Sequence, residues 1–304
     1  MENKPEIQTC FEPKTGTFQY VIADPSTRDC VIIDSVLDFD SATNQISTTS
    51  ADKLLAIVDN HNYKVTRILE THAHADHITA SSYLQKQIFQ KHQHRPSICI
   101  GKRITEVQET FGRRYDIDPS ELHAIFDHLF SDDEKFAVGN LTAEVLHLPG
   151  HTPDHVGYMI GENVFTGDSI FNPDVGSARA DFPGGSAKAL YKSMRTLLAL
   201  PAHYRLYTGH DYPPETREAT GAEGGRERAY TTVGEQNESN KHAKAGSSEE
   251  DFVSWRSERD GGLAEPKQIH QALQFNIRAG HLPRASADGY RFLHVPLKVS
   301  NMSF

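Results

Sequence analysis

The stretch THAHADH, residues 71–77, places three histidines and one aspartate within six positions of a 304-residue chain. It follows residues 64–69, whose alternating apolar side chains predict a buried strand. Imidazole and carboxylate groups are costly to bury without partners, so a run of them at a strand end is hard to explain as packing. The same groups are common ligands of metal ions. The stretch therefore predicts a metal-binding loop with the candidate ligands His72, His74, Asp76 and His77.

Three more candidate ligands follow apolar segments further along the chain. His151 lies in PGHTPDH (149–155), Asp168 in FTGDS (165–169) and His210 in YTGHDY (207–212). We expect several strands to end at one edge of a sheet, so that their loops bring all seven side chains into one cleft. A site of nitrogen and oxygen ligands suits a zinc hydrolase that activates water, or a non-haem iron centre with open positions. The residues alone leave these two chemistries open.

The series THAHADH, PGHTPDH, TGDS and GHDY resembles the metallo-β-lactamase superfamily, from about residue 17 to residue 212. The resemblance implies an α+β fold, the αββα sandwich, in which two mixed β-sheets flanked by helices carry the metal site at one edge. We accordingly expect a catalytic domain over residues 1–212. A polar insertion, expected to be irregular or partly mobile, follows over residues 213–248, and a C-terminal extension over 249–304 is expected to pack on the catalytic domain.

Within that superfamily, HADHITAS (74–81), the segment GDSIFNPDVGSARADFPGG (167–185) and GHDY resemble the persulfide dioxygenases, also called sulfur dioxygenases. The segments TTVGEQNESN (231–240) and FNIRAGHLP (275–283) resemble the C-terminal extension of bacterial β-lactamase-like hydrolase proteins associated with sulfide response. The resemblance implies an enzyme of sulfide metabolism that oxidises glutathione persulfide with O2 to sulfite and glutathione.

The resemblance also assigns roles to the seven candidate ligands. It implies one Fe(II) per chain, held by a catalytic triad of two histidines and one carboxylate: His72, His151 and Asp168. The remaining ligand positions of the superfamily would surround the iron while a second metal site stays empty, and they are occupied by His74, Asp76, His77 and His210.

Two further residues match the glutathione-contacting positions of the persulfide dioxygenases. Arg179 offers a guanidinium fork for the substrate's carboxylates, and Tyr212 offers a phenol for a polar contact to the bound thiol. Many persulfide dioxygenases read Gly-Arg-Thr-Asp-Phe here, whereas this chain reads ARADF over residues 178–182. The missing glycine and hydroxyl could alter how the thiol substrate sits.

The alternative is a zinc-dependent thioester hydrolase of the glyoxalase II type, with one or two Zn(II) ions and a bridging hydroxide. All seven ligand positions are present, so the ligands do not exclude it. The glyoxalase motif usually continues with paired glycines, but residues 78–81 here are ITAS. His210 is also followed by Asp-Tyr, where the glyoxalases have Glu-Tyr. These two departures favour the dioxygenase.

Charge and composition exclude several other classes. A formal net charge of −10 repels phosphate backbones, which argues against nucleic-acid binding and against a nuclease of the same superfamily. No run approaches the roughly 18 to 20 apolar residues of a membrane span. The N-terminal residues MENKPEIQTC resemble neither a secretory signal nor a transit peptide, so we expect a cytoplasmic protein. Whether the chain forms a homodimer is left open.

Residues outside these motifs receive structural interpretations. His155 follows His151 by four positions and is expected to support the site without binding the metal. Trp255 belongs to a tail with regularly spaced apolar residues and is expected to lie in the core. The cysteines are too few and too scattered for a disulfide framework or a thiolate zinc cluster, which indicates a reducing compartment: Cys10, Cys30 and Cys99.

Overall fold

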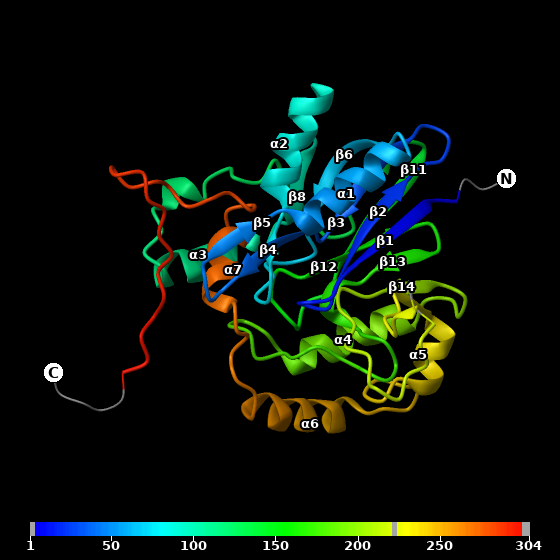
Figure 1. Ribbon diagram of the computed structural model, residues 1–304. Coiled ribbons are helices and arrows are strands. Elements are labelled where there is room, and N and C mark those ends of the chain that lie inside the picture. The colour runs from blue at the N-terminus through cyan, green and yellow to red at the C-terminus, as the bar shows by residue number, and fades with distance from the viewer. Residues whose placement is uncertain (1–3, 221–223, 300–304) are drawn as a thin grey trace.

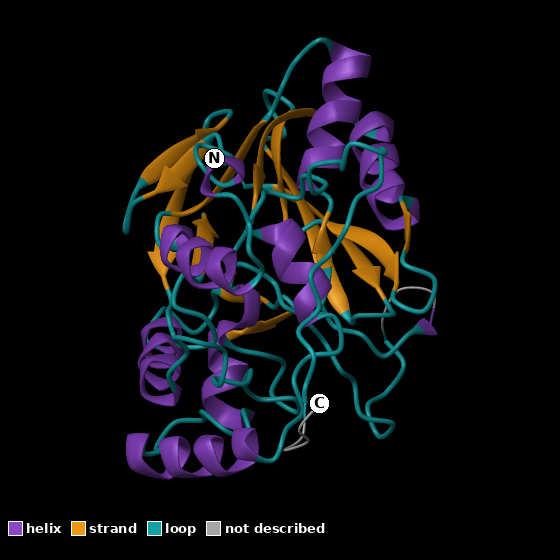
Figure 2. Ribbon diagram, turned by 90° about the vertical axis from the view of Figure 1, so that its left-hand side faces the viewer, coloured by secondary structure: helices purple, strands orange, loops and turns teal. Residues whose placement is uncertain are grey.

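Two six-stranded β-sheets form the centre of the structure, a computed structural model that describes residues 4–220 and 224–299. The first sheet has the strand order β1-β2-β3-β6-β8-β9, and the second has the order β10-β11-β12-β13-β14-β15. Both sheets are mixed. In the first, β3, β6, β8 and β9 run parallel, and in the second, β13 runs parallel to β14. Helices lie on both sides of the strands (Figures 1 and 2).

The strands are short, and each sheet takes its strands from one half of the chain. The first sheet consists of β1 Glu6–Glu12, β2 Thr17–Ala23, β3 Asp29–Ile33, β6 Lys64–Leu69, β8 Ser97–Gly101 and β9 His128–Phe130. The second consists of β10 Lys135–Val138, β11 Leu141–His147, β12 Val156–Ile160, β13 Asn163–Phe165, β14 Arg205–Tyr207 and β15 Tyr230–Thr232. A small third sheet contains β4 Val36–Asp40, β5 Gln45–Ser47 and β7 Ile78–Thr79.

The helices complete a four-layer arrangement of helix, sheet, sheet and helix. The first sheet is covered by α1 Thr49–Asn60, α2 Ser81–His92, α3 Ile104–Arg114 and α7 Ile269–Asn276. The second sheet is covered by α4 Ala187–Leu198, α5 Val233–Ser239 and α6 Glu249–Gly261. Two short 3-10 helices lie in loops, η1 Pro119–Glu121 and η2 Gly167–Ser169. This layering confirms the expected αββα sandwich.

The alternation of side chains along the strands explains why both faces of the first sheet are buried. In β2, Tyr20 and Ile22 point into the cluster between the two sheets, while Val21 points into the cluster under α1 and α2. All seven residues of β2 are buried. A strand with both faces buried fixes the register in which its neighbours pair. The fixed register also determines where the loops at the strand ends begin.

Helix α4 has Ser186 as its N-terminal capping residue. The hydroxyl of Ser186 accepts a hydrogen bond from the backbone N–H of Ala189 at 3.2 Å, which satisfies one free donor of the first turn. Leu190, Met194 and Leu197 lie on one face and are buried against the second sheet. This helix closes the outer face of the sheet that carries Asp168 and His210.

The segment 213–248 continues the second sheet, although the sequence places a domain boundary after residue 212. Strand β15 pairs with β14 and helix α5 follows it. The side chain of Gln236 donates to the carbonyl of Phe171 at 2.9 Å. The segment is polar because its side-chain amides donate hydrogen bonds to loop carbonyls. Packing of this kind leaves no regular spacing of apolar residues in the sequence.

The C-terminal extension contributes to the cores on both sides of the sandwich. Phe252 of α6 packs in the cluster with α4, and Leu273 of α7 packs in the cluster with α3. After α7 the chain continues without helix or strand through residue 299. The last part of the expected extension, residues 300–304, lies outside the described residues.

Candidate metal centre

The seven predicted ligands meet where four strand ends come together. The loop 70–77 follows β6, the loop 148–155 follows β11, η2 follows β13, and the loop 208–212 follows β14. Their ligand atoms sort into two neighbouring sets in which every atom lies within 4.8 Å of the others. We define ligand group 1 as His72, His151 and Asp168. We define ligand group 2 as His74, Asp76, His77 and His210.

Ligand group 1 converges on one oxygen of Asp168. This oxygen, Oδ2, lies 3.9 Å from His72 Nε2 and 3.5 Å from His151 Nε2. Ligands bound about 2.1 Å from one ion in tetrahedral or octahedral geometry lie roughly 3.0–3.5 Å apart. All three residues are buried. The distance to His151 lies at the upper end of this range and the distance to His72 lies above it, so the spacing is close to that of donors that share a cation.

Ligand group 2 is joined to group 1 through the same carboxylate. His210 Nε2 lies 3.5 Å from Asp168 Oδ2 and 3.2 Å from Asp76 Oδ2. His77 Nδ1 lies 3.3 Å from Asp76 Oδ2. Asp76 is the only member of the two groups that is partly exposed, with 31% of its side chain accessible. The second group is therefore the one that opens to the surface.

Two buried carboxylates contact the Nε2 atom of His74. Its Nε2 lies 3.2 Å from Asp34 Oδ1 and 3.3 Å from Glu70 Oε2. Burial alone would lower the pKa of His74, but these carboxylates raise it well above its ordinary value. Glu70 also accepts hydrogen bonds from the hydroxyls of Thr79 and Ser81. The Nε2 atom of His74 is thus occupied by contacts with Asp34 and Glu70, and only Nδ1 faces the other members of group 2.

His72 has the opposite electrostatic environment. Burial, and after it the positive imidazoles nearby, lowers the pKa of His72 well below its ordinary value. Its Nδ1 lies 2.9 Å from the hydroxyl of Thr71. That hydroxyl donates its hydrogen to Asp34 at 2.9 Å, so its oxygen accepts a hydrogen bond from the Nδ1–H of His72. His72 is therefore neutral, and its Nε2 lone pair points at the carboxylate of Asp168.

Unpartnered buried atoms test whether these residues fit a metal ion. Within the described residues, His72 Nε2 and Asp168 Oδ1 in group 1 are buried without a hydrogen-bond partner. His74 Nδ1 and His77 Nε2 in group 2 are in the same condition. A buried polar atom left in this way costs about 1–3 kcal/mol. A bound cation would satisfy these atoms, so the histidines and aspartates fit a metal.

Backbone contacts fix the loop that carries the first four ligands. The carboxylate of Asp154 accepts the N–H of Ala73 at 2.9 Å. The side-chain amide of Asn276 in α7 donates to the carbonyls of His74 and His77, at 2.8 Å each. Asn276 also accepts the N–H of Thr79 at 2.9 Å. The C-terminal extension therefore shapes the ligand loop, a role that the sequence did not reveal.

His155 supports Asp168, in agreement with its expected role. Its Nε2 accepts the backbone N–H of Asp168 at 2.9 Å. The other ring nitrogen lies 3.3 Å from the hydroxyl of Ser169. Because Nε2 accepts, the imidazole is neutral, and burial lowers the pKa of His155 well below its ordinary value. His155 orients a candidate ligand and does not belong to either ligand group.

A cavity of about 400 Å³ opens onto both groups. It contains the two expected substrate contacts, Arg179 and Tyr212, beside His151, Asp168 and His210. The guanidinium of Arg179 donates twice to Asp181, at 2.6 Å each, and once to the carbonyl of Ala264 at 3.0 Å. The Tyr212 ring is stacked at 5.8 Å on the His210 ring and is half exposed.

The far wall of this cavity comes from the C-terminal part of the chain. Its members there include basic and aromatic residues that sequence reasoning did not select: Lys241, His242, Trp255, Arg256 and Arg259. The expectation that Trp255 lies in the core holds only in part. Its ring packs beside Phe252 in the α4–α6 cluster, yet it also lies 3.9 Å from the His242 ring and lines the cavity. These residues of the cavity wall do not belong to any of the sequence motifs that indicate metal ligands.

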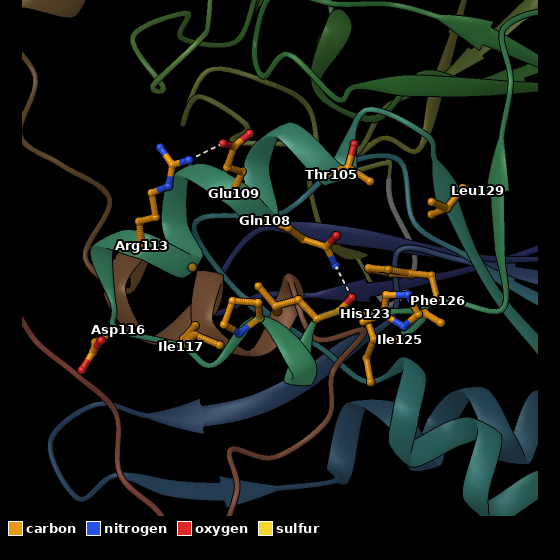
Figure 3. Close-up of a pocket in the computed structure, with 14 residues that line it drawn as sticks. Thr105, Gln108, Glu109, Arg113, Asp116, Ile117, His123, Ile125, Phe126 and Leu129 are labelled. Carbon is orange, nitrogen blue, oxygen red and sulfur yellow. Dashed lines mark hydrogen bonds and ion pairs between the residues drawn. The ribbon is translucent and has the colours of Figure 1, made fainter.

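A second cavity of about 740 Å³ lies away from the ligand groups. It is bounded by α3 and by the segment that runs from Asp116 to Leu129 (Figure 3). Glu109 and Arg113 form an ion pair at its edge, and Gln108 donates to the carbonyl of Leu122 in its wall. None of the predicted site residues lines it. This cavity is larger than the one beside the ligand groups, so cavity size alone would not have located the candidate metal centre.

The layering and the ligand set together define a class of metal-dependent enzymes. Residues 13–210 match the family model described as the metallo-beta-lactamase superfamily, and the chain belongs to this superfamily. None of the helices in the described part of the chain is long and apolar enough to cross a membrane.

Individual relatives carry different names. A beta-lactamase hydrolase-like protein of Agrobacterium fabrum is 44% identical over 97% of this chain, which spans 65% of that relative's length. Glyoxylase B2 of Dictyostelium discoideum is 40% identical, with 98% of both chains covered. The human persulfide dioxygenase ETHE1 is 27% identical over 90% of this chain and 88% of its own.

A solved structure agrees over almost the whole chain. The crystal structure of ETHE1 from Myxococcus xanthus superposes with a TM-score of 0.69 and 29% sequence identity. The match covers 91% of this chain and 100% of that one. The fold similarity therefore extends over most of the chain.

Proposed function

We propose that this chain is an iron-dependent persulfide dioxygenase that uses ligand group 1 to hold a single Fe(II). The observation that carries the proposal is the sorting of the ligand atoms. Two histidines and one carboxylate form group 1, which is the ligand set of non-haem iron oxygenases with open coordination positions. His74 falls into the other group, because its Nε2 is held by Asp34 and Glu70.

The reaction proposed is the oxidation of a persulfide by O2. The terminal sulfur of glutathione persulfide loses four electrons, O2 accepts them, and water supplies the third oxygen of sulfite as glutathione is released. A bound Fe(II) would supply adjacent positions where the sulfur and O2 meet. The chain's own residues position the ligands: Thr71 and His155 orient His72 and Asp168.

The cavity beside group 1 suits a substrate of this kind. Its volume of about 400 Å³ is within the usual range for small-molecule sites. Arg179 is proposed to contact a substrate carboxylate and Tyr212 the bound thiol, because both line the same cavity as His151. The resemblance to the human persulfide dioxygenase and to the Myxococcus xanthus structure supports this assignment.

Oxygen uptake tests the proposal directly. Protein purified without oxygen is assayed for metal content and then mixed with glutathione persulfide in an oxygen electrode. We expect about one iron per chain and consumption of O2 with production of sulfite. Iron-loaded protein that consumes no O2 with this substrate would refute the proposed activity.

One observation favours a second candidate, a zinc-dependent thioester hydrolase. Asp168 Oδ2 lies 3.5 Å from both His151 and His210, so one carboxylate can bridge ligands of the two groups. A dinuclear site needs such a bridge. About two zinc ions per chain together with hydrolysis of S-lactoylglutathione would support this candidate, and the name of the Dictyostelium relative points the same way.

A further inference from the structure

Four consecutive residues beside the metal centre are each held by the C-terminal part of the chain. In residues 177–180, the N–H of Ser177 is accepted by His242 at 3.0 Å, and the carbonyl of Ala178 accepts from Arg256 at 3.2 Å. The Arg179 side chain donates to the carbonyl of Ala264, and the N–H of Ala180 is accepted by Asp260 at 2.8 Å. This segment has no helix or strand of its own.

Two of these holding residues form a buried ion pair on α6. Arg256 and Asp260 stand one helical turn apart, and their closest nitrogen and oxygen are 2.5 Å from each other. Their side chains are 5% and 7% exposed. Burying a charged pair is costly, and further atoms of the two side chains hydrogen-bond to the backbone of residues 178 and 180. The pair therefore acts on the loop as well as on its own helix.

The held segment makes one contact with ligand group 1. The backbone carbonyl of Arg179 lies 2.8 Å from His151 Nδ1. A carbonyl only accepts hydrogen bonds, so Nδ1 of His151 must carry the proton. The lone pair then lies on Nε2, which is 3.5 Å from Asp168 Oδ2. Such a backbone contact sets both the tautomer and the ring orientation of a metal-binding histidine.

We propose that Asp260 and Arg256 are positioning residues for the metal centre. They fix the backbone of residues 178–180 so that the carbonyl of Arg179 holds His151 in its metal-binding tautomer. The C-terminal extension, which contains no ligand, thereby sets the geometry of ligand group 1. The inference rests on the proposed metal site, but its contacts join protein groups only.

The test removes the ion pair without leaving a charge buried. The double substitution Arg256→Met with Asp260→Leu replaces both charges by apolar groups, an exchange that folded proteins often tolerate. Asp260→Asn is the conservative variant, because its amide oxygen still accepts the N–H of Ala180. Glu258→Ala is the matched control, since Glu258 is an exposed acid on the same helix and makes no contact with residues 177–180 among the described interactions.

Two measurements on the full chain decide the question. The nitrogen chemical shifts of labelled His151 report its tautomer in the metal-free protein, and titration with Fe(II) under argon reports metal affinity. We expect the double variant to mix the two tautomers and to bind iron about 10- to 100-fold more weakly. Asp260→Asn should lie between it and the wild type, and Glu258→Ala should match the wild type.

The proposal is overturned if the double variant keeps a single Nδ1–H tautomer, or if it binds iron with wild-type affinity. Failure of the wild-type chain to bind iron would count against the proposed function instead. The tautomer measurement still tests the positioning role in that case, because it needs no metal. A merely structural role would lower the melting temperature of the metal-free chain and leave the tautomer unchanged.

Discussion

Ligand group 1 takes each of its members from a different loop, whereas ligand group 2 takes three of its four from residues 74–77. Group 2 is therefore largely local, and its internal contacts are short, at 3.2 and 3.3 Å around Asp76. Group 1 depends on three loops that meet in space, and its contacts are 3.5 and 3.9 Å. A set assembled in this way needs each loop to be held by a residue outside the site.

The residues that hydrogen-bond to the ligands also differ between the two groups. Each ligand of group 1 is held by one group outside the set: the Thr71 hydroxyl for His72, the Arg179 carbonyl for His151, and His155, which accepts the backbone N–H of Asp168. In the two histidines this contact leaves only Nε2 free. In group 2, Asp76 is contacted by two other members. Both groups also contain buried imidazole nitrogens without a hydrogen-bond partner among the described residues, so both present donors to a cation. The two groups differ in how many separate loops must be held in place.

Replacing Asp168 with Ala should have the largest effect, because Asp168 is the only carboxylate of group 1. We expect iron to be lost and oxygen uptake with glutathione persulfide to fall by more than about a hundredfold. This loss is larger than the roughly 10- to 100-fold effect that is usual when a residue that hydrogen-bonds to a metal ligand is replaced. Metal analysis and the oxygen electrode measure both. A variant with full iron content and full uptake would show that group 1 is not the metal site.

Exchanging one histidine in each group tests the comparison itself. His72→Ala should remove iron, while His77→Ala should retain about one iron per chain and keep activity within about tenfold. Metal content of the two variants, measured side by side, decides the matter. If His77→Ala instead lowers the metal count from two to one, both groups bind metal and the thioester hydrolase becomes the better assignment.

Arg179→Ala should act on the substrate and spare the metal, because the backbone carbonyl that holds His151 remains. Losing a charge-assisted contact to a carboxylate should raise KM for glutathione persulfide about tenfold or more. Steady-state kinetics with parallel iron analysis measure this. An unchanged KM would mean that another cation in the cavity, such as Lys241 or Arg259, contacts the substrate.

Tyr212→Phe should have the smallest effect, since it keeps the ring that stacks on His210 and removes only the hydroxyl. A single hydrogen bond is worth about 0.5–1.5 kcal/mol, which corresponds to roughly a two- to tenfold fall in kcat/KM. The comparison with Arg179→Ala shows which side of the cavity the substrate uses. A fall as large as that of Asp168→Ala would place the phenol in contact with the reacting atoms.

The ligands could be predicted from sequence because metal binding restricts the residue types. A run such as THAHADH at a strand end has few structural explanations, so spacing alone located four of the seven ligands: His72, His74, Asp76 and His77. The sandwich followed from the resemblance, and the four-layer core confirms it. The resemblance also placed His74 outside the triad, but the contact that holds it there was not predictable, because Asp34 lies forty residues earlier in the chain.

The wall of the cavity was missed for a different physical reason. Arg256 and Asp260 look like an ordinary helical ion pair, and their contacts with residues 178 and 180 span about eighty positions of sequence. Side chains that hold backbone groups are drawn from common polar types, so composition carries no signal for them. Trp255 was assigned to the core because apolar spacing does not distinguish a core residue from one that lines a cavity.

The hydrogen bonds from Asn276 to the carbonyls of His74 and His77 have a consequence for the order of events during synthesis. They join positions 202 and 199 residues apart. At about 5–20 residues per second, the ribosome delivers Asn276 some 10–40 s after the ligand loop. The loop therefore lacks these two hydrogen bonds until Asn276 has been synthesised, and the shape of the metal site is completed only after the C-terminal extension has reached it.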